Sequence, residues 1–405
     1  MNILWICPRF PYPPDQASEA TIYKQLKYLS AVNKITLLTF IDDKARSKLL
    51  PMLSEYCARI ETFQRRPNYS ALNFVLACRG ESFTVARYHS WEMLKCSKEL
   101  IESGEFDVVH VAFYYMAQYA FSGRIRVPGK TAVVLDAHLV EHLFYSRAAE
   151  LSRNPFIKLL MRIESLRVKK YEASVYKKFD RCIAVSELDM ENMIKISNAA
   201  NIVVISHFVE TPDAGQGAPF TQEDEKGILF FGSLKYPAND DAVRFFYRDI
   251  LPLIKKEIPD VRFLIAGRSA SGYVAGLSVD PCVRYMGFVP DIKDLLRTVA
   301  LVVVPLRLGG GIRIKILESW AMAKAVVSTT IGAEGVRVKD GEDIIIADSA
   351  ADFANAVIML LRDKSERERI GRAAFQKVRE YYSPEKKVEN LERIYKEALQ
   401  EKMAG

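Results

Sequence analysis

The sequence lacks the features that mark several classes of protein. Its 405 residues contain no run of 18 apolar residues, so we expect no membrane-spanning helix. The six cysteines are scattered and form no Cys-x-x-Cys pair, so we expect neither a structural zinc site nor a disulfide framework. The N-terminal residues have no basic start and reach a proline at Pro8, which argues against a signal peptide. Together these absences predict a cytoplasmic protein.

Positive charge is distributed unevenly along the chain. The net charge is +7, and residues 141–181 alone contain ten basic against five acidic side chains, interleaved with apolar ones. One interpretation is a helix with a solvated face and a single core-facing stripe. The other is a surface for peripheral contact with an anionic membrane or an anionic acceptor, since each basic residue near such a membrane contributes about 1 kcal/mol. No nucleic-acid recognition motif accompanies the charge, so we expect no nucleic-acid partner.

Short β-branched runs alternate with helical patterns along the whole chain. Strands that alternate with helices of this kind are typical of βαβ units and a parallel sheet. We therefore expect an α/β protein with two doubly wound, Rossmann-like domains. The predicted strands are Asn2–Cys7, Ile35–Phe40, Phe106–Val111, Thr131–Asp136, Cys182–Val185, Ile202–Ile205, Gly227–Phe231, Arg262–Ala266, Val283–Met286, Leu301–Pro305, Ala325–Thr329 and Ile344–Ala347. The predicted helices are Ala20–Ser30, Trp91–Ser103, Asp240–Glu257, Ile292–Thr298, Arg313–Ala323, Ala350–Asp363, Glu366–Tyr381 and Pro384–Gln400.

A segment rich in proline, glycine and acidic residues separates the two halves. Residues 208–226 show no hydrophobic period, which predicts a linker between a first domain over 1–207 and a second over 227–383. The final helix, 384–400, packs on the second domain or returns to the first. Two such domains would face each other across a cleft, because doubly wound sheets bind ligands at the carboxyl ends of their strands.

The densest chemical signal lies in residues 301–335. A buried strand ends at Pro305, three glycines follow at 309–311, and a helix begins soon after them. The glycines let the main chain approach a ligand closely, and the start of the helix adds free amides and a positive end. Arg313 and Lys315 would add two cationic donors for phosphate oxygens. The segment therefore predicts an anion site.

The spacing of these side chains sets a condition. Residues two apart on a helix point roughly 200° from one another. Arg313 and Lys315 can therefore both reach one phosphate group only if Arg313 still belongs to the loop. Glu318, one turn deeper on the face of Lys315, suits hydrogen bonding to a ribose diol. The alternatives are a flexible glycine turn, a solvated helix start and a simple pairing of Glu318 with Lys315.

Residues 309–335, GGGIRIKILESWAMAKAVVSTTIGAEG, resemble the donor-site signature of a known family: the retaining nucleotide-sugar glycosyltransferases with the GT-B fold, specifically the triple-glycine subgroup of glycosyltransferase family 4. The resemblance extends over most of the chain. ILFFGSLKYPANDDAVRFFYRDILPLIKKEIPDVRFLIAGR and MGFVPDIKDLL are similar to the second domain of that family, and VVLDAHLVEHL and FDRCIAVSELDMENM resemble its acceptor-side domain.

The resemblance implies roles for individual residues. Glu318 matches the glutamate that binds the nucleotide ribose, and Arg313 and Lys315 match the pair that neutralises the diphosphate. His138 matches the histidine that reaches the donor sugar from the opposite domain, although a lone histidine after a strand is more often structural. We expect His110, His142 and His207 to be structural. The other implied donor-binding residues are Gly232, Ser233 and Lys235, the glycines Gly309, Gly310 and Gly311, and the base-contacting Phe288 and Val289.

Some positions depart from the family pattern. Gln16–Ser18 replaces a glycine-rich turn, Ser233 stands where arginine is common, and ISHFVET replaces a segment that often holds an Asn-Gly pair. Asp136 and Glu141 are weak candidates for an acid–base pair. The sequence contains no Asp-x-Asp triplet, the usual carboxylate grip on a metal-bound sugar nucleotide. We therefore expect neither a metal nor another cofactor, and cations and amides would balance the charge of the leaving diphosphate.

The resemblance thus implies a hexosyltransferase-type enzyme of cell-surface glycan or polysaccharide biosynthesis. It would move a sugar from a nucleotide-diphosphate donor to a hydroxyl of a glycan or lipid-linked acceptor, with retention of configuration. It would be cytoplasmic or peripheral on the cytosolic face of a membrane. The alternatives are an epimerase or phosphorylase on the same scaffold, or a non-catalytic sugar-nucleotide-binding subunit, which the altered Gln16–Ser18 loop suggests.

Overall fold

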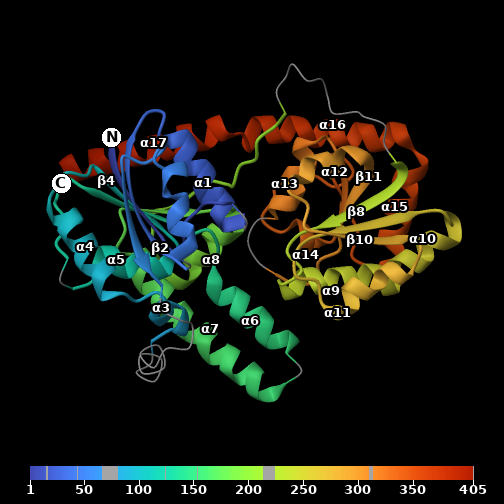
Figure 1. The fold of residues 1–405 in the computed structure, drawn as a ribbon, viewed down its shortest axis with the longest axis horizontal. Helices are drawn as coiled ribbons and strands as arrows, with labels where there is room; N and C mark the ends of the chain where they lie inside the picture. The colour runs from blue at the N-terminus through green and yellow to red at the C-terminus, as the bar shows by residue number, and fades with distance from the viewer. Residues whose placement is uncertain are drawn as a thin grey trace. The chain divides into compact units, whose positions relative to one another are not determined.

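The chain folds into two compact units. The computed structural model describes residues 1–14, 17–42, 44–65, 81–123, 125–152, 154–212, 224–309 and 313–404. Unit 1 comprises Met1–His207 and Lys387–Gly405, and unit 2 comprises Phe208–Lys386 (Figure 1). Gln16, Gly310, Gly311 and residues 213–223 of the expected linker lie outside the described residues. No helix among the described residues is long and apolar enough to cross a membrane.

Unit 1 is built on a parallel sheet. Among the described residues its strand order is β3-β2-β1-β4-β5-β6-β7, and each neighbouring pair runs parallel. Central strands are buried on both faces and therefore read as continuous apolar runs. The order reverses between β1 and β4, so their carboxyl ends are the expected ligand position. The strands are β1 (Asn2–Cys7), β2 (Lys34–Ile41), β3 (Arg59–Gln64), β4 (Val108–Ala112), β5 (Ala132–Asp136), β6 (Arg181–Ala184) and β7 (Ile202–Val204).

Helices of unit 1 begin at capping residues that the sequence supplies. Ser90 and Ser186 accept hydrogen bonds from the amides of Met93 and Asp189. Asn154 caps the helix that begins at Pro155, so the expected helical region 141–181 divides into two helices. The helices are α1 (Ala17–Leu29), α3 (Phe83–Arg87), α4 (Trp91–Glu102), α5 (Gln118–Phe121), α6 (Glu141–Leu151), α7 (Pro155–Tyr176), α8 (Glu187–Ser197) and α17 (Pro384–Ala404), with 3₁₀ turns at Lys44–Met52 and Tyr114–Ala117.

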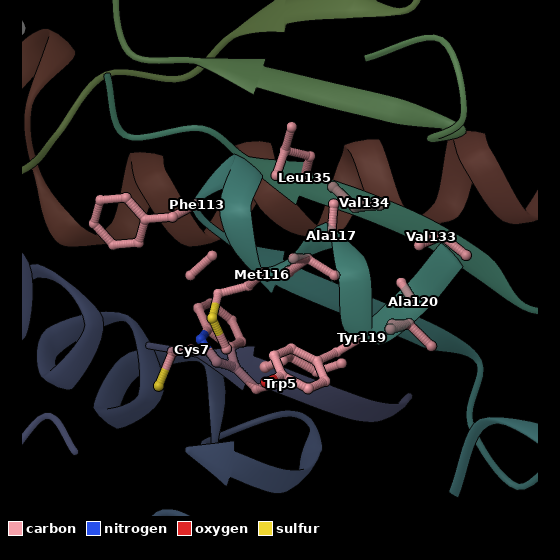
Figure 2. Packing of buried hydrophobic residues seen from close by; sticks show 14 of the residues in the cluster. Trp5, Cys7, Phe113, Met116, Ala117, Tyr119, Ala120, Val133, Val134 and Leu135 are labelled. Carbon is pink, nitrogen blue, oxygen red and sulfur yellow. The ribbon is translucent and has the colours of Figure 1, made fainter. Parts of the chain in front are cut away.

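The core of unit 1 surrounds Trp5 of β1. Its ring stacks on that of His110 on β4, with centroids 3.7 Å apart. In Figure 2, Met116 and Tyr119 from the segment after β4 lie beside Trp5. Leu391 and Tyr395 of α17 are buried in the same core, and the Tyr395 hydroxyl hydrogen-bonds to His110 at 2.8 Å. The final helix therefore joins unit 1 from Lys387 onward, the second of the two placements that its sequence allows.

Unit 2 repeats the doubly wound arrangement. Among the described residues its sheet has the order β10-β9-β8-β11-β12-β13, again with parallel neighbours. The order reverses between β8 and β11. The strands are β8 (Asp224–Phe231), β9 (Arg262–Ala266), β10 (Val283–Gly287), β11 (Val299–Val304), β12 (Ala325–Ser328) and β13 (Ile345–Ile346). The helices are α9 (Pro237–Phe245), α10 (Leu251–Glu257), α11 (Gly272–Gly276), α12 (Ile292–Thr298), α13 (Ile314–Ala321), α14 (Thr330–Ala333), α15 (Ala350–Arg362) and α16 (Lys364–Tyr381), with a 3₁₀ turn at Leu277–Val279.

Three local differences from the expected elements have physical causes. Strand β3 was not expected, because this edge strand is only partly buried and RIETFQ carries a weak apolar pattern. Strand β8 begins at Asp224, inside the segment expected to be a linker. The expected helix over 240–257 is interrupted by a π-turn at Phe246–Ile250, just before Pro252, which has no amide hydrogen to donate to the preceding turn.

Candidate functional site

The loops after β8 and β9 approach each other through two glycines. The Gly232 amide donates to the Ala266 carbonyl at 2.9 Å, and the Leu234 amide donates to the Arg268 carbonyl at 3.0 Å. A Cβ on Gly267 would lie 2.0 Å from the Gly232 carbonyl oxygen, so only glycine permits this approach. Gly232 itself has a φ of +142°, which disfavours other residues. At Gly232 and Gly267 the two loops therefore present main chain rather than side chains.

Lys315 of α13 joins the two sides of the point where the strand order reverses. Its Nζ donates to Asn239 Oδ1 of α9 at 2.8 Å, and Asn239 Nδ2 donates to the Ser233 carbonyl at 2.8 Å. The ammonium also lies 4.2 Å from the centroid of the buried Phe230 ring. A Cβ on Gly232 would come within 3.1 Å of Nζ. The loop after β11 thus places a cation directly against the glycine loop after β8, the expected ligand position of a doubly wound sheet.

The charge of Lys315 is destabilised in this position. Burial, followed by the positive charge of Arg313, lowers the pKa of Lys315 from 10.5 to about 7, against the opposing effect of Glu318. A bound anion would favour the charged form and raise that pKa again.

Arg313 fulfils the condition that its spacing from Lys315 set. It precedes α13, with φ −86° and ψ 87°, so it belongs to the loop and not to the helix. The side chain is buried, with 7% of its surface exposed, which excludes a solvated helix start for this residue. Gly309, at φ +122°, lies against it: a Cβ there would be 2.6 Å from Arg313 Nη2. The positive φ at 309 is a conformation that favours glycine, and the guanidinium lies in the space that a side chain there would occupy.

The other predicted donor-side residues occupy the same end of the sheet. Glu318 is partly buried one helical turn after Lys315, and its negative charge favours the charged form of Lys315. Ser233 and Lys235 are exposed in the loop after β8. Phe288, directly after β10, is 52% exposed, and the Arg268 guanidinium lies 3.6 Å from its ring centroid. Val289 is partly buried beside it. The loops after β8, β9, β10 and β11 thus each supply part of the site.

Sequence reasoning missed four residues of this region. Asn239 orients Lys315, Gly267 permits the loops to meet, Arg268 covers Phe288, and the Tyr285 hydroxyl donates to the Gly267 carbonyl at 2.8 Å. Gly267 and Arg268 directly follow a strand that the sequence predicted. Their position at the carboxyl end of that strand was the signal that could have identified them.

In unit 1, two strained residues meet at the ends of adjacent strands. Phe113 follows β4 with a φ of +71°, and His138 follows β5 with a φ of +59°. Such conformations cost about 1–3 kcal/mol each and concentrate at functional sites. The two rings stack with centroids 4.4 Å apart, and His207 stacks on His138 at 5.7 Å. His138 thus lies at the carboxyl end of β5, stacked on Phe113 at the end of the neighbouring strand β4.

The surroundings of His138 disfavour its charged form. Burial lowers the pKa of His138, and the nearby Lys387 acts in the same direction against the opposing effect of Asp136. His138 Nε2 lies 3.7 Å from Asp136 Oδ2, which accepts a hydrogen bond from Gln25 Nε2 at 2.9 Å. Burial alone would raise the pKa of Asp136, but His138, Lys387 and this hydrogen bond hold it low. A neutral imidazole can donate or accept a hydrogen bond without adding charge.

The remaining histidines and Glu141 are engaged in packing. His110 is fully buried, and burial lowers its pKa to about 3. His142 Nδ1 lies 2.7 Å from Glu172 Oε2. Burial, together with the charge of Glu172, raises the pKa of Glu141 to about 8. No contact joins Glu141 to Asp136 among the contacts of the described residues, so the structure does not bring these two carboxyl groups together as an acid–base pair.

A pocket opens beside the strained residues of unit 1. It has a volume of ≈ 190 Å³ and lies at the carboxyl ends of β1 and β4, where the strand order reverses. Tyr88 and Tyr115 stack with centroids 4.6 Å apart on one side of it. Its lining residues are Pro8, Arg9, Ser18, Glu19, Ile22, Tyr88, Phe113, Tyr115 and Leu139. Among the described residues, no group of three His, Cys, Asp or Glu side chains is arranged to hold a metal ion.

Comparison with known proteins identifies the family and the fold of the chain. Residues 69–212 match the family model "Glycosyltransferase Family 4", and residues 225–363 match "Glycosyl transferases group 1". TarM of S. aureus superposes on 97% of this chain and 98% of its own with a TM-score of 0.71 and 12% identity. The chain belongs to the GT-B glycosyltransferases. His138 lies within the family 4 match of this glycosyltransferase, and Lys315 lies within the group 1 match.

Two further similarities extend over nearly the whole glycosyltransferase. An uncharacterised 44.6 kDa protein in the cps region of Klebsiella pneumoniae is 22% identical over 390 residues, which are 93% of this chain and 95% of that protein. Anabaena HepE, solved in complex with UDP, superposes on 97% of this chain and 99% of its own with a TM-score of 0.66 and 15% identity. At these identities the solved structures establish the fold.

Proposed function

We propose that this glycosyltransferase moves a sugar from a nucleotide-diphosphate donor to a hydroxyl acceptor, with retention of configuration and without a divalent metal. The contact of Lys315 with Asn239 across the reversal of the strand order carries the proposal, because it places a cation against two glycine loops at one edge of the sheet. HepE has been solved with UDP and with UDP-glucose, which supports a nucleotide-diphosphate donor.

The leaving diphosphate determines the chemistry. The bond between the anomeric carbon and the diphosphate oxygen breaks, and its electron pair stays on that oxygen. The acceptor oxygen attacks the same face of the sugar, and its proton passes to the departing phosphate. Lys315, Arg313 and the amides after Gly309 are proposed to stabilise the growing negative charge, a contribution that typically amounts to about 2.7–4 kcal/mol per donor. Glu318 is proposed to bind the ribose, and Phe288 and Val289 the base.

Unit 1 is proposed to bind the acceptor. The pocket beside Tyr88, Tyr115 and Phe113 offers ring faces for a sugar or a lipid-linked glycan, and Arg9 and Glu19 line it with polar groups. Ser18, from the segment that departs from the family pattern, also lines this pocket. We assign His138 as the group of unit 1 that contacts the donor sugar.

The relatives suggest a biological setting. The Klebsiella protein is named for its cps region, which supports a role in polysaccharide or cell-surface glycan biosynthesis. We propose a cytoplasmic enzyme that contacts the cytosolic face of an anionic membrane through residues 141–181, where such acceptors would be assembled.

A thermal-shift panel tests the proposal. Uridine, guanosine, adenosine and cytidine diphosphates and their sugars are added with and without EDTA, and ligand that binds only the folded state raises the midpoint. We expect a rise with one base that EDTA does not remove. A rise that requires a divalent ion would contradict metal independence. Donor turnover without an acceptor would indicate an epimerase, and binding without diphosphate release would indicate a non-catalytic subunit.

A further inference from the structure

The N-terminal half of α7 exposes large apolar side chains. Among the described residues, a third of the exposed large apolar side chains lie between Phe156 and Leu166. Two of them, Phe156 and Leu166, are 67% and 68% exposed, and Leu159 and Leu160 are at least half exposed. In Figure 1, α6 and α7 lie side by side as a hairpin of unit 1. Exposed apolar side chains concentrated in this way mark an interaction surface.

These side chains share one face of the helix. Phe156, Leu159, Leu160, Ile163 and Leu166 follow the helical spacing of three and four residues and form what we call the α7 stripe. The buried residues of α7 begin at Ser165 and lie roughly on the opposite side, where the helix packs on unit 1. The stripe is therefore not the core-facing stripe that an amphipathic helix normally has. It is a second apolar face, directed away from the core.

The exposed charged side chains of α7 are all positive. Both carboxylates of α7 are engaged by unit 1: Glu164 accepts from Ser82 Oγ at 2.7 Å, and Glu172 accepts from the Glu141 amide at 2.8 Å. Arg162, Lys169 and Lys170 are exposed and form no ion pair with another described residue. A helix with a broad apolar face flanked by outward cations is typical of one that lies in the interface of an anionic bilayer.

We propose that the α7 stripe inserts into the surface of an anionic lipid bilayer while Arg162, Lys169 and Lys170 bind the lipid headgroups. The inference sharpens the membrane contact of the proposed function, on which it rests, by assigning insertion to one helix face. Charge complementarity favours lipid over a second copy of the chain, because two like faces would bring these cations together. The bulk bilayer, and not the bound acceptor, is the partner of this surface.

Cosedimentation with vesicles tests the inference. The full chain is mixed with vesicles of equal parts phosphatidylglycerol and phosphatidylcholine, or with phosphatidylcholine alone. The apolar variant carries Leu159→Ser, Leu160→Ser and Leu166→Ser, and its matched control carries Val32→Ser, Val279→Ser and Met403→Ser at other exposed apolar positions. We expect the apolar variant to bind anionic vesicles at least about tenfold more weakly than the wild type, and the control variant to bind like the wild type.

A charge series separates insertion from attraction. The variant Arg162→Glu, Lys169→Glu, Lys170→Glu should bind anionic vesicles much more weakly, and its residual binding should no longer depend on salt. The control variant Lys95→Glu, Arg393→Glu, Lys396→Glu should keep both the binding and its salt dependence. The inference is overturned if the wild type ignores anionic vesicles, if the apolar variant binds as well as its control, or if the wild type is a stable dimer that the apolar variant converts to a monomer. Nucleoside diphosphate affinity should be equal in all variants. A wild-type protein that binds no nucleoside diphosphate would contradict the proposed donor site and not the membrane contact.

Discussion

The two units share a topology and differ in what they place at the point where the strand order reverses. In unit 2 the strand ends carry glycines and two cations, Lys315 and Arg313. In unit 1 they carry rings, with Phe113 stacked on His138 and Tyr88 on Tyr115. Main-chain amides and cations suit a diphosphate, whereas ring faces suit a sugar. Under the proposed function, one topology thus serves donor and acceptor through the chemistry of a few loop residues.

Lys315→Met should have the largest effect on activity, because it removes a cation from the strand ends of unit 2. It removes the cation but keeps a chain that can pack on Phe230, so turnover should fall by about 10²–10³-fold. Because burial disfavours the charge of Lys315, the melting temperature at pH 6 should not fall. Steady-state kinetics and calorimetry measure the two effects. A fall in melting temperature that accompanies the fall in turnover would make Lys315 a structural residue.

His138→Asn tests the contribution of unit 1. Asparagine tolerates the positive φ of this position but lacks the imidazole. We expect turnover to fall by about 10–100-fold, the value of a hydrogen bond to a charged group, with nucleoside diphosphate affinity unchanged. The matched control, His89→Asn, removes a histidine that pairs with Gln118 and should retain activity. Weaker diphosphate binding in His138→Asn would place this residue at the diphosphate and not at the donor sugar.

Glu318→Gln sharpens the assignment within unit 2. If Glu318 binds the ribose, nucleoside diphosphate affinity should fall by about tenfold and pyrophosphate affinity should not change. Titration calorimetry with both ligands distinguishes this role from a pairing with Lys315, which would weaken both equally. Glu342→Gln, an exposed change in the same unit, serves as the control.

The pH dependence of binding is the smallest effect. In the unliganded protein the pKa of Lys315 is about 7, and a bound diphosphate raises it. Affinity should therefore fall as pH rises above 7, by at most about tenfold per unit, with proton uptake on binding. Unfolding shows the opposite trend: the unfolded chain holds this proton up to its ordinary pKa of 10.5, so the contribution of Lys315 to stability rises with pH from about 7 to 10.5. Neither effect should survive in Lys315→Met.

The sequence predicted strands better than contacts. Apolar runs such as NILWIC identified the buried strands, because parallel strands are covered on both faces, but RIETFQ at the sheet edge was missed. The spacing of Arg313 and Lys315 required Arg313 to lie in the loop before the helix, and its backbone angles place it there. Asn239 could not be predicted, because its contact with Lys315 joins residues far apart in the chain. The outward direction of the α7 stripe depends on tertiary packing, which periodicity does not contain.

The most direct test is titration calorimetry in EDTA with the nucleoside diphosphate that gives the largest thermal shift. If glycine loops and two cations hold the diphosphate without a metal, the wild type binds it saturably and Lys315→Met binds it at least about a hundredfold more weakly. Binding that appears only when magnesium is restored, or that is equal in the two proteins, would contradict this claim.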